Sequence, residues 1–570
     1  MERRWHHREA PSAELTEALT QSIKVDAVLA QLLLNRGVFD FKTAEHFFKP
    51  NKHLLHDPFL MHGMSDAVNR ILRAVEKKES ILIYGDYDVD GTTAVSLVYH
   101  YLKSHHAPIQ YYIPDRYTEG YGISNQSIEF AAQHTFTLII ALDCGIKALE
   151  PIEKAKQLQI DVIVCDHHLP GPKLPNAHAI LNPKQKACQY PYKELSGAGI
   201  GFKLIQALSK SFHDEDATWA YLDLVVSSIA ADMVPITGEN RVLAFLGLQQ
   251  INLYPRAGLK VLLEGGAIKT PVTISTLVFT LAPRINAAGR MKHAHMAVEL
   301  LLCDEESQAV LLSAEINDTN LLRRDVDSET TLQAIEMVKS NPENEKKFST
   351  VLFHSGWHKG IVGIVASRLI EQFYKPTIIL TESDGKLTGS ARSVRDFDLH
   401  AALEQCSDLL LQFGGHKFAA GLTLEKSMLN PFILKFETVA SGMISPEQRI
   451  PSLEIEAELA FEQLTPKFLK VLEKMAPHGP SNLNPLFISK NVQDSGWAQV
   501  TGQNHLKLQL FQKQNVNLQF AAIAYHLGNL IDLIQSKRPF DIVYKIIFTK
   551  PGSGSKRSIQ LVIEDLKPSV

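Results

Sequence analysis

The chain is poor in cysteine and has no long apolar run. Its five cysteines, among 570 residues, form no CxxC pair, which excludes a disulfide-stabilised secreted scaffold and favours a reducing cytosol. No stretch approaches the roughly 18 apolar residues of a membrane-spanning helix. The N-terminal sequence MERRWHHREAPSAELTEALTQ lacks the continuous apolar core of a signal peptide. We therefore expect a cytoplasmic protein without a membrane segment.

The chain also lacks an excess of basic charge. Its formal net charge is -4 and its pI is about 6.6, so any binding of nucleic acid must come from local basic patches. A hydrophobic content of 45% and a charged content of 21% are ordinary for a folded protein. The length is too great for one hydrophobic core, and the usual domain size predicts about three or four domains.

Five segments differ in their sequence pattern. Residues 1–80 are typical of short helices interrupted by proline, and we expect them to cap the domain that follows. Residues 81–290 open with apolar runs that alternate with helical stretches, which predicts a doubly wound α/β domain. Residues 291–345 predict a helical connector. Residues 346–445 predict a second α/β lobe with three glycine-rich turns (WHKGIVGIVASR, GSARS and FGGHKFAAG), and residues 446–570 predict a small β-barrel.

Acidic and imidazole side chains follow several of the apolar runs. The heptapeptide GDYDVDG (85–91) comes directly after ILIY, Asp143 follows TLIIAL, and the tripeptide Asp166-His167-His168 follows DVIVC. Asp232 follows LDLVVSSIA, which we interpret as a fourth strand. Ligands of open parallel sheets bind outside the carboxyl ends of the strands, so these side chains are expected to meet at one site.

Each of these motifs has a simpler interpretation when it is taken alone. GDYDVDG matches the first half of an EF-hand loop, but position 12 of that loop is Leu97 instead of a glutamate, and a strand replaces the helix expected before it. His167 and His168 are typical of a hydrogen-bonded structural pair, and Asp232, shortly before Pro235, is typical of a turn. The recurrence of the pattern at successive strand ends favours a shared metal site.

The ligand types suggest both the metal and the reaction. Five or six carboxylate and imidazole groups without a thiolate cluster suit Mn²⁺ or Mg²⁺ better than structural zinc. Two such ions, about 3.5 to 4 Å apart, activate a water molecule and stabilise both oxygens of an in-line phosphoryl displacement. The residues therefore predict hydrolysis of a phosphate ester or anhydride.

The order GDYDVDG, DCG, DHH and AAD resembles the DHH phosphoesterase superfamily. Further motifs along nearly the whole chain resemble the RecJ family within it, which are bacterial exonucleases specific for single strands. These motifs are RYTEGYG (116–122), LSGAGIGFK (195–203), RINAAGR (284–290), WHKGIVGIVASR, GSARS and GGHKFAAG. The resemblance implies a DHH catalytic domain at 81–290, a DHH-associated substrate-binding domain at 346–445 and an OB-fold at 446–570.

The resemblance also implies roles for individual residues. The metal ligands are expected to be Asp88, Asp90, Asp143, His167 and Asp232, with Asp143 as the bridging carboxylate. Asp86 and His168 are expected either to orient the ligands or to contact the substrate phosphate. The residues expected to hold phosphate or DNA are Arg116, Tyr121, Arg290, Ser390, Arg392 and His416.

Two of these roles have alternatives. Arg116 is expected to bind the 5′-terminal phosphate through its guanidinium fork, and its alternative is a surface ion pair with Glu119. Tyr121 is expected to stack on a base near the strand end, and its alternative is to pack a loop between two glycines. These alternatives stay open at the level of the sequence.

The C-terminal segment resembles the OB-fold of the RecJ family, a fold that binds single strands by aromatic stacking and a positive groove. The candidate contacts are Trp497, Lys507, Phe511, Lys545, Lys556 and Arg557, although barrel core is the alternative for most aromatic residues there. The chain departs from the family where a Phe-Gly-x-Gly-Asn-Pro loop is common. There the sequence is PHGPSNLNPLF (477–487), with His478 in place of the phenylalanine and Ser481 in place of the second glycine.

The expected function is a 5′-to-3′ exonuclease that hydrolyses single-stranded DNA to 5′-mononucleotides with two Mn²⁺ or Mg²⁺ ions, in DNA repair and recombination. The resemblance implies a helicase and single-strand binding protein as partners, and we expect a monomer. One alternative is a phosphodiesterase for cyclic dinucleotides or very short RNA, but that branch tends to carry a histidine where this chain has Tyr84. Another is a non-catalytic scaffold of the Cdc45 kind, and the full set of Asp and His residues argues against it.

Overall fold

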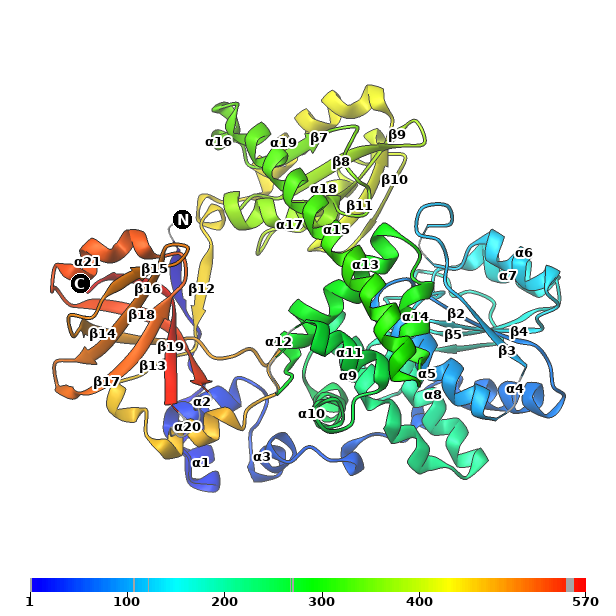
Figure 1. The fold of residues 1–570 in the computed structure, drawn as a ribbon, viewed down its shortest axis with the longest axis horizontal. Coiled ribbons are helices and arrows are strands. Elements are labelled where there is room, and N and C mark those ends of the chain that lie inside the picture. Colours follow the sequence, from blue (N-terminus) through cyan, green and yellow to red (C-terminus); the bar gives the residue numbers. More distant parts are fainter. Residues whose placement is uncertain are drawn as a thin grey trace.

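The computed structural model describes residues 3–105, 108–120, 122–266, 268, 271–549 and 558–569. Three bodies surround the centre of the ribbon view in Figure 1. The first α/β domain lies on the right, the second lobe at the top and the β-barrel on the left. Among the described helices, none is both long enough and apolar enough to cross a membrane.

The first domain is built on a parallel five-stranded sheet of order β3-β2-β4-β5-β6. Its strands are β2 (Ile81–Gly85), β3 (Ile109–Tyr112), β4 (Leu138–Leu142), β5 (Asp161–Cys165) and β6 (Ala179–Leu181). The chain leaves β2 in one direction to form β3 and then returns to the other side of β2 for β4. The strand order therefore reverses between β2 and β4, which is the position where doubly wound sheets bind ligands.

Alternate side chains of the buried strands serve the two faces of this sheet. Ile81 and Ile83 pack in one core cluster with α4 (Met64–Glu76), α5 (Val89–Ser104) and α8 (Gly197–Phe212). Leu82 and Tyr84 pack in another with α6 (Asn125–Gln133) and α7 (Leu149–Gln157). This double burial explains the continuous apolar runs of the strands, and it confirms the predicted α/β class.

The segment LDLVVSSIA is a helix, and the prediction of a fourth strand there is wrong. It forms α9 (Leu222–Ala231), which packs against α5, α8 and α10 (Gly238–Leu253). Every residue from Leu222 to Ala230 is buried, so the helix has no solvent-exposed polar face that would reveal its period. The domain is completed by η3 (Glu215–Tyr221), α11 (Ala257–Gly265), α12 (Ile274–Thr276), η4 (Leu277–Leu281) and α13 (Ala282–Met291).

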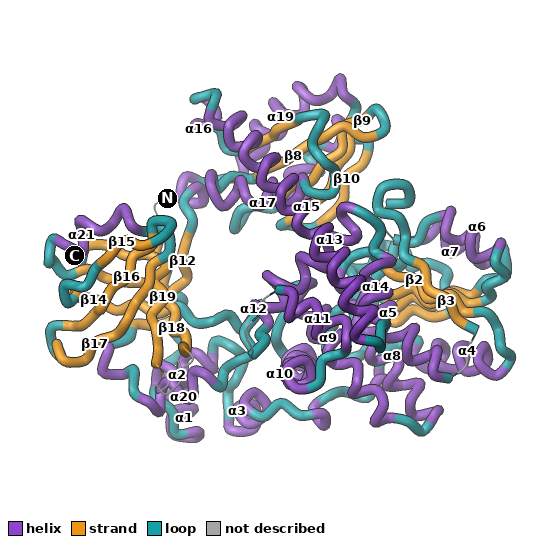
Figure 2. Tube along the Cα trace, in the orientation of Figure 1, coloured by secondary structure: helices purple, strands orange, loops and turns teal. Residues whose placement is uncertain are grey.

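The predicted helical connector is confirmed. It consists of α14 (His295–Leu302), α15 (Glu306–Lys339) and α16 (Glu343–Lys346). The 34 residues of α15 span roughly 51 Å at 1.5 Å per residue. One end packs on α11 and α13, and the other packs on α17 and β7 of the second lobe, so one helix joins the two lobes (Figure 2).

The second lobe has a mixed sheet of order β10-β11-β9-β8-β7, in which only β7 and β8 are parallel. Its elements are β7 (Thr350–Phe353), α17 (Val362–Phe373), β8 (Thr377–Ser383), β9 (Lys386–Arg392), α18 (Leu399–Glu404), η5 (Ser407–Leu409), β10 (Gln412–Gly415), β11 (Ala419–Leu424), η6 (Lys426–Met428) and α19 (Leu429–Met443). GSARS lies mainly in β9, so its prediction as a turn is wrong. A Cβ at Gly389 would lie 2.2 Å from the carbonyl oxygen of Ile379 on β8, which explains the glycine there.

The C-terminal barrel closes through five strands, in the ring β14-β18-β19-β17-β16 and back to β14, with β17 and β19 parallel. This is the strand order of an OB-fold. The elements are η7 (Pro446–Arg449), β12 (Ser452–Ile455), β13 (Ala457–Glu458), η8 (Phe461–Gln463), α20 (Pro466–Glu473), β14 (Phe487–Asp494), β15 (Gln499–Thr501), β16 (His505–Gln512), β17 (Asn515–Ala524), η9 (Gly528–Leu530), α21 (Ile531–Gln535), β18 (Phe540–Thr549) and β19 (Ser558–Pro568).

The helices of residues 1–80 do not form one cap over the first domain, contrary to the expectation from the sequence. β1 (Arg4–His7) pairs in parallel with β12 beside the barrel. Next come α1 (Ala13–Ile23), α2 (Ala27–Leu34), α3 (Phe41–Phe48), η1 (Lys52–Leu54) and η2 (Pro58–Leu60). The apolar faces of α1 to α3 share one core with the barrel, and only α4 belongs to the core of the first domain.

We predict that Gly258→Ala destabilises the first domain. A Cβ at this position of α11 would lie 2.0 Å from the carbonyl oxygen of Leu300 on α14, so the two helices must separate. Such overpacking costs about 1 to 3 kcal/mol, which a fall in the thermal transition should report. The control is Gly442→Ala in α19, where no atom lies within 4 Å of a new Cβ. That variant should be neutral or slightly more stable; an unchanged transition in Gly258→Ala would contradict the packing.

Candidate metal centre and phosphate site

The acidic turn after β2 begins the site. Asp86 follows the strand directly, and Asp88 caps α5, its Oδ1 accepting a hydrogen bond from the Gly91 amide at 3.1 Å. A Cβ at Gly91 would lie 2.4 Å from the carbonyl oxygen of Asp86, so the turn requires glycine there. The turn thereby brings Asp86, Asp88 and Asp90 to the carboxyl end of the sheet within five residues.

Asp90 is held by the N-terminus of α8. Its two oxygens accept hydrogen bonds from the amides of Gly197 and Ala198, both at 2.8 Å, and Ser228 of α9 donates to Oδ1 at 2.7 Å. A helix N-terminus stabilises negative charge, so Asp90 stays oriented although it is buried. Its Oδ2 lies 3.6 Å from Nε2 of His167.

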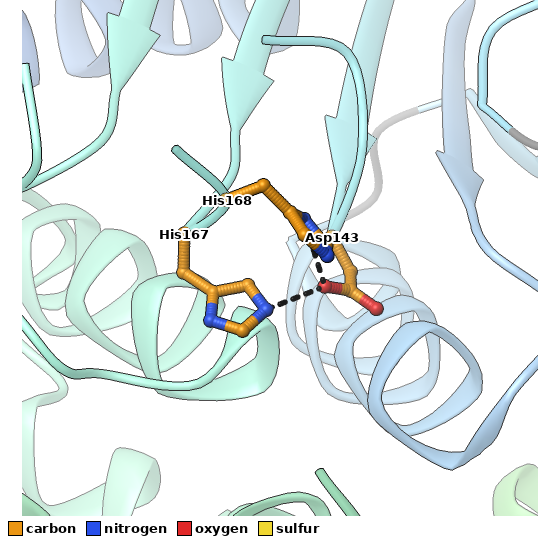
Figure 3. A group of neighbouring side chains, drawn as sticks. All are labelled: Asp143, His167 and His168. Atoms are coloured by element: carbon orange, nitrogen blue, oxygen red, sulfur yellow. Dashed lines mark ion pairs between the residues drawn. The ribbon is translucent and has the colours of Figure 1, made fainter. Parts of the chain in front are cut away.

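His167 stands at the centre of the acidic cluster. Its Nε2 lies 3.1 Å from Asp143 Oδ1 and 3.5 Å from Asp232 Oδ2. Figure 3 shows His167 and His168 on the loop after β5, with both rings turned toward Asp143. His168 Nδ1 lies 4.0 Å from the same oxygen of Asp143. The sequence-predicted ligands therefore do come together, although Asp232 lies at the end of a helix instead of a strand.

Three groups of these side chains could each hold a metal ion, because their ligand atoms lie within 4.8 Å of one another. They are Asp86, Asp88 and Asp143; Asp90, His167 and Asp232; and Asp143, His167 and His168. Asp143 belongs to two of them. A cation held by Asp86 and Asp88 would lie next to Asp143, and a cation held by Asp90 and Asp232 would lie next to His167. Both positions therefore border the third group, which contains Asp143 and His167.

The electrostatics of the cluster fit a divalent cation. Burial, together with neighbouring carboxylates, raises the pKa of Asp86, Asp88 and Asp143, and it raises the pKa of Asp232 to about 9. Burial lowers the pKa of His167, which keeps its imidazole neutral and able to donate a lone pair. Among the described residues, neither ring nitrogen of His167 has a hydrogen-bond partner. Oxygen and imidazole donors without a thiolate suit Mn²⁺ or Mg²⁺.

Asp166 is a residue that the sequence-based ligand set missed. Its Oδ1 accepts hydrogen bonds from Nδ1 of His168, at 2.7 Å, and from the His168 amide, while its Oδ2 accepts one from the Ile146 amide. Burial acts to lower the pKa of His168, but the bond and charge of Asp166 outweigh it and raise that pKa. Asp166 thus fixes the ring of His168. Its position directly before the two histidines was the available signal.

Arginines from both lobes gather beside the acidic cluster. Arg116 places its guanidinium carbon 4.8 Å from the centre of the Tyr87 ring, and no described residue forms an ion pair with it. Glu119, its alternative partner, instead accepts hydrogen bonds from Tyr112, Asp115 and Ser124.

The other two arginines approach Arg116 from α13 and β9. Burial, together with the neighbouring charges of Arg116 and Arg392, lowers the pKa of Arg290 to about 10. A Cβ at Gly363, in the first turn of α17, would lie 2.9 Å from Nη2 of Arg392 and 3.2 Å from Oγ of Ser390. These side chains therefore converge where α17 begins, and they could hold a phosphate.

His416 lies apart from that group. It lines a cleft of about 970 Å³ between the lobes, together with Asp166 and His168 of the first domain and Gly389 of the second. Tyr121 lies outside the described residues. Tyr84 is buried, and its hydroxyl donates a hydrogen bond to the carbonyl oxygen of Gly122 at 2.7 Å. The position where the cyclic-dinucleotide branch tends to carry a histidine is therefore filled by a buried tyrosine.

Comparisons with known proteins agree with this arrangement. The model of the DHH family, N-terminal domain, matches residues 80–229, that of the DHHA1 domain matches residues 345–441, and that of the RecJ OB domain matches residues 455–565. The parallel sheet, the Asp and His cluster at its switch point and the associated second lobe define a DHH phosphoesterase.

Individual relatives narrow the assignment. The chain is 36% identical over 560 residues to the single-stranded-DNA-specific exonuclease RecJ of Bacillus subtilis, covering 97% of this chain and 70% of that protein. It is 30% identical to RecJ of Escherichia coli, covering 97% and 98%. The crystal structure of Thermus thermophilus RecJ in complex with Mn²⁺ superposes with a TM-score of 0.84 at 25% identity, covering 100% of this chain and 80% of that one. The chain belongs to the RecJ family of single-stranded-DNA-specific exonucleases.

We predict that Gly197→Ala inactivates the site although it leaves every proposed metal-binding residue unchanged. A Cβ at Gly197 would lie 2.6 Å from Cβ and 2.7 Å from Oδ1 of Asp143, so Asp143 must move. A displacement of about 1 Å at a reacting centre costs roughly 100-fold in rate, which a steady-state measurement of kcat would detect. The matched control is Gly199→Ala on the same helix, where the nearest atom lies at 3.3 Å. Equal activity of the two variants would exclude this role.

We also predict that Mg²⁺ stabilises the protein more at pH 8.5 than at pH 6.5. The pKa of Asp232, raised from 3.8 to about 9, means that the folded state binds more protons than the unfolded state over that interval. The metal-free protein therefore loses stability as the pH rises, while protons compete less with the metal. The shift in melting temperature at one fixed Mg²⁺ concentration measures this difference. It should shrink in Asp232→Asn, and a larger shift at pH 6.5 would contradict the prediction.

Proposed function

We propose that this protein degrades single-stranded DNA from the 5′ end and releases 5′-mononucleotides, using two divalent ions. The observation that carries the proposal is the position of Asp143. It belongs both to the group with Asp86 and Asp88 and to the group with His167 and His168, so one carboxylate can serve two neighbouring ions. When bound, the ions would supply an activated water and stabilise the negative charge of the phosphodiester.

The protein's own residues prepare the reaction. Asp90 is fixed by α8 and Ser228, and His168 is fixed by Asp166, so the ligand geometry exists before substrate arrives. The neutral imidazole of His167 is available as a donor because burial lowers its pKa. Asp88, Asp90, Asp143, His167 and Asp232 are the proposed ligands, and Asp86 and His168 complete the groups around them.

The arginines support the proposed 5′-to-3′ direction. A strand whose 5′-terminal phosphate lies among Arg116, Arg290, Arg392 and Ser390 would present its first internucleotide phosphate to the acidic cluster. His416 would contact the bound nucleotide from the second lobe, because it lines the same cleft as His168. The two lobes are joined by α15, and a path between them that admits one strand and excludes a duplex would give the preference for single strands.

We propose that the barrel binds a part of the strand that lies outside the cleft. The side chain of Trp497 is 71% exposed and that of Tyr525 is 51% exposed, so both are available for stacking on bases. Lys545 is engaged with Glu564 at 2.7 Å, and Lys556 and Arg557 lie outside the described residues. The family resemblance further suggests work in DNA repair and recombination as a monomer, with a helicase and single-strand binding protein as partners.

The proposal predicts that Asp143→Asn loses more than about 100-fold in hydrolysis while it still binds strands. The assay uses Mn²⁺ with end-labelled single strands, the corresponding duplex and a cyclic dinucleotide, so that it reports polarity and substrate class together. Wild-type protein should degrade only the single strand, and 5′ label should appear first as mononucleotide. Release of 3′ label first, or degradation of the cyclic dinucleotide, would overturn the proposal.

A further inference from the structure

The loop of residues 475–483 is closed around one buried side chain. Asn482 donates hydrogen bonds to the carbonyl oxygens of Met475, at 2.9 Å, and Pro477, at 2.8 Å. The backbones of Gly479 and Asn482 also exchange two hydrogen bonds. His478 is partly buried and its ring faces the Asn482 carbonyl at 3.2 Å. The loop that departs from the family pattern is therefore compact and turned inward.

One arginine holds this loop from the barrel side. Arg36, which follows α2, donates from Nε to Asn482 Oδ1 at 2.8 Å and from Nη2 to the Leu483 carbonyl at 2.9 Å. Its two terminal nitrogens also bind both oxygens of Glu456, at 2.6 and 2.8 Å. Arg36 and Glu456 are both buried, and this pair fixes the loop relative to the barrel core.

A second arginine holds the same loop from the catalytic side. Arg241, on α10, is 5% exposed and donates to the carbonyl oxygens of Phe47, Ala476 and Pro477 at 3.0, 3.1 and 3.3 Å. Its guanidinium carbon lies 3.7 Å from the centre of the Phe47 ring. The Ile236 amide adds a hydrogen bond to the Pro480 carbonyl at 2.8 Å. No carboxylate forms an ion pair with Arg241 in the part of the chain described.

The same turn of α10 also fixes the chain between the two bodies. Glu239 pairs with Lys203 at 2.7 Å, and both side chains are fully buried. Glu239 also accepts hydrogen bonds from the His56 amide and the Tyr190 hydroxyl. His56 lies on the segment that connects α3 with α4. Glu239 therefore fixes the segment that runs from α3, beside the barrel, to α4 of the catalytic domain, and Arg241 fixes the loop at 475–483.

We propose that Arg241 is a positioning residue that sets the barrel at a fixed distance and orientation from the metal centre, so that one strand engages both. This inference rests on the proposed function, in which the barrel holds the strand. It assigns the loop at 475–483 to contact between the two bodies instead of contact with DNA. Arg36, Arg241, the Ile236 amide and the loop itself engage the side chain of Asn482 and the carbonyl oxygens of Ala476, Pro477, Pro480 and Leu483.

The physical reason for such a lock is effective concentration. A strand already held at the barrel reaches the cleft as an intramolecular event, and this advantage is largest when the span is fixed to match the path. Loss of the Arg241 contacts would let the barrel adopt many orientations, and this would lower the effective concentration of the strand at the cleft. The loss must therefore grow with strand length and vanish for strands too short to reach the barrel.

The test compares Arg241→Ala with wild type on strands of about 6 and about 40 nucleotides. We expect KM for the long strand to rise at least about fivefold, with kcat for both strands and KM for the short strand unchanged. Hydrogen exchange should show faster exchange in residues 475–483 with the barrel strands still protected. Arg241→Lys, which keeps the charge and part of the hydrogen bonding, should lie between the two and serves if the alanine variant does not fold.

The control is Arg395→Ala, which removes an exposed ion pair with Glu454 between the second lobe and β12 and should leave both KM values unchanged. Equal KM values for wild type and Arg241→Ala on the long strand would overturn the inference. So would an equal change for both strand lengths, which indicates damage to the catalytic domain. If wild type itself shows no dependence on length, the barrel's part in the proposed function fails, and this inference fails with it.

Discussion

Repulsion between like charges is the constraint on which this structure depends. Asp86, Asp90 and Asp143 are buried within one cluster, and the fold removes the water that would otherwise separate their charges. The N-terminus of α8, the hydroxyl of Ser228 and the ring of His168 offset part of that cost. The remainder keeps the pKa values of several carboxyls high until a cation is present. Hydrogen bonds therefore keep the carboxylates of the site oriented, while repulsion between their charges remains unfavourable.

The arginines beside the acidic cluster carry the opposite charge, and they come from both lobes. Arg392 of β9 comes close to Arg116 and Arg290, and burial together with mutual repulsion lowers the pKa of Arg290. In the proposed function, a strand of phosphates would satisfy both halves of the site, because it would supply anions to the arginines and bring cations with it to the carboxylates. Helix α15 holds the halves at a set separation because it packs on both lobes. In this proposal, substrate and metal would together neutralise the two opposite groups of charges.

Much of this could be predicted from the sequence because it follows local rules. Parallel strands end in polar residues at a common edge, and this rule placed Asp88, Asp143 and His167 together. The α/β class, the connector and the barrel followed from the periodicity of each segment. The prediction of a strand before Asp232 failed because α9 is buried from Leu222 to Ala230 and has no solvent-exposed polar face there.

The long-range contacts could not be predicted. Nothing in the spacing of α1 to α3 indicates that their partners are barrel strands more than 400 residues later. The hydrogen bonds of Arg36 to Asn482 and of Arg241 to Pro477 also join residues far apart in the sequence, with separations of 446 and 236 residues. Asp166 was visible within its tripeptide, but its role became apparent only with the distance to His168.

The core that the N-terminal helices share with the barrel affects how the protein folds during its synthesis. Leu29, Leu32 and Leu33 share this core with Phe487 and Tyr544, which are synthesised more than 450 residues later. At typical rates of translation the wait lasts roughly 20 to 90 s. Throughout that time the apolar faces of α1 to α3 have no partner, while the two α/β lobes can already fold. These helices leave the ribosome well before the barrel strands that complete their core, and this segment is where a nascent chain most needs protection from aggregation.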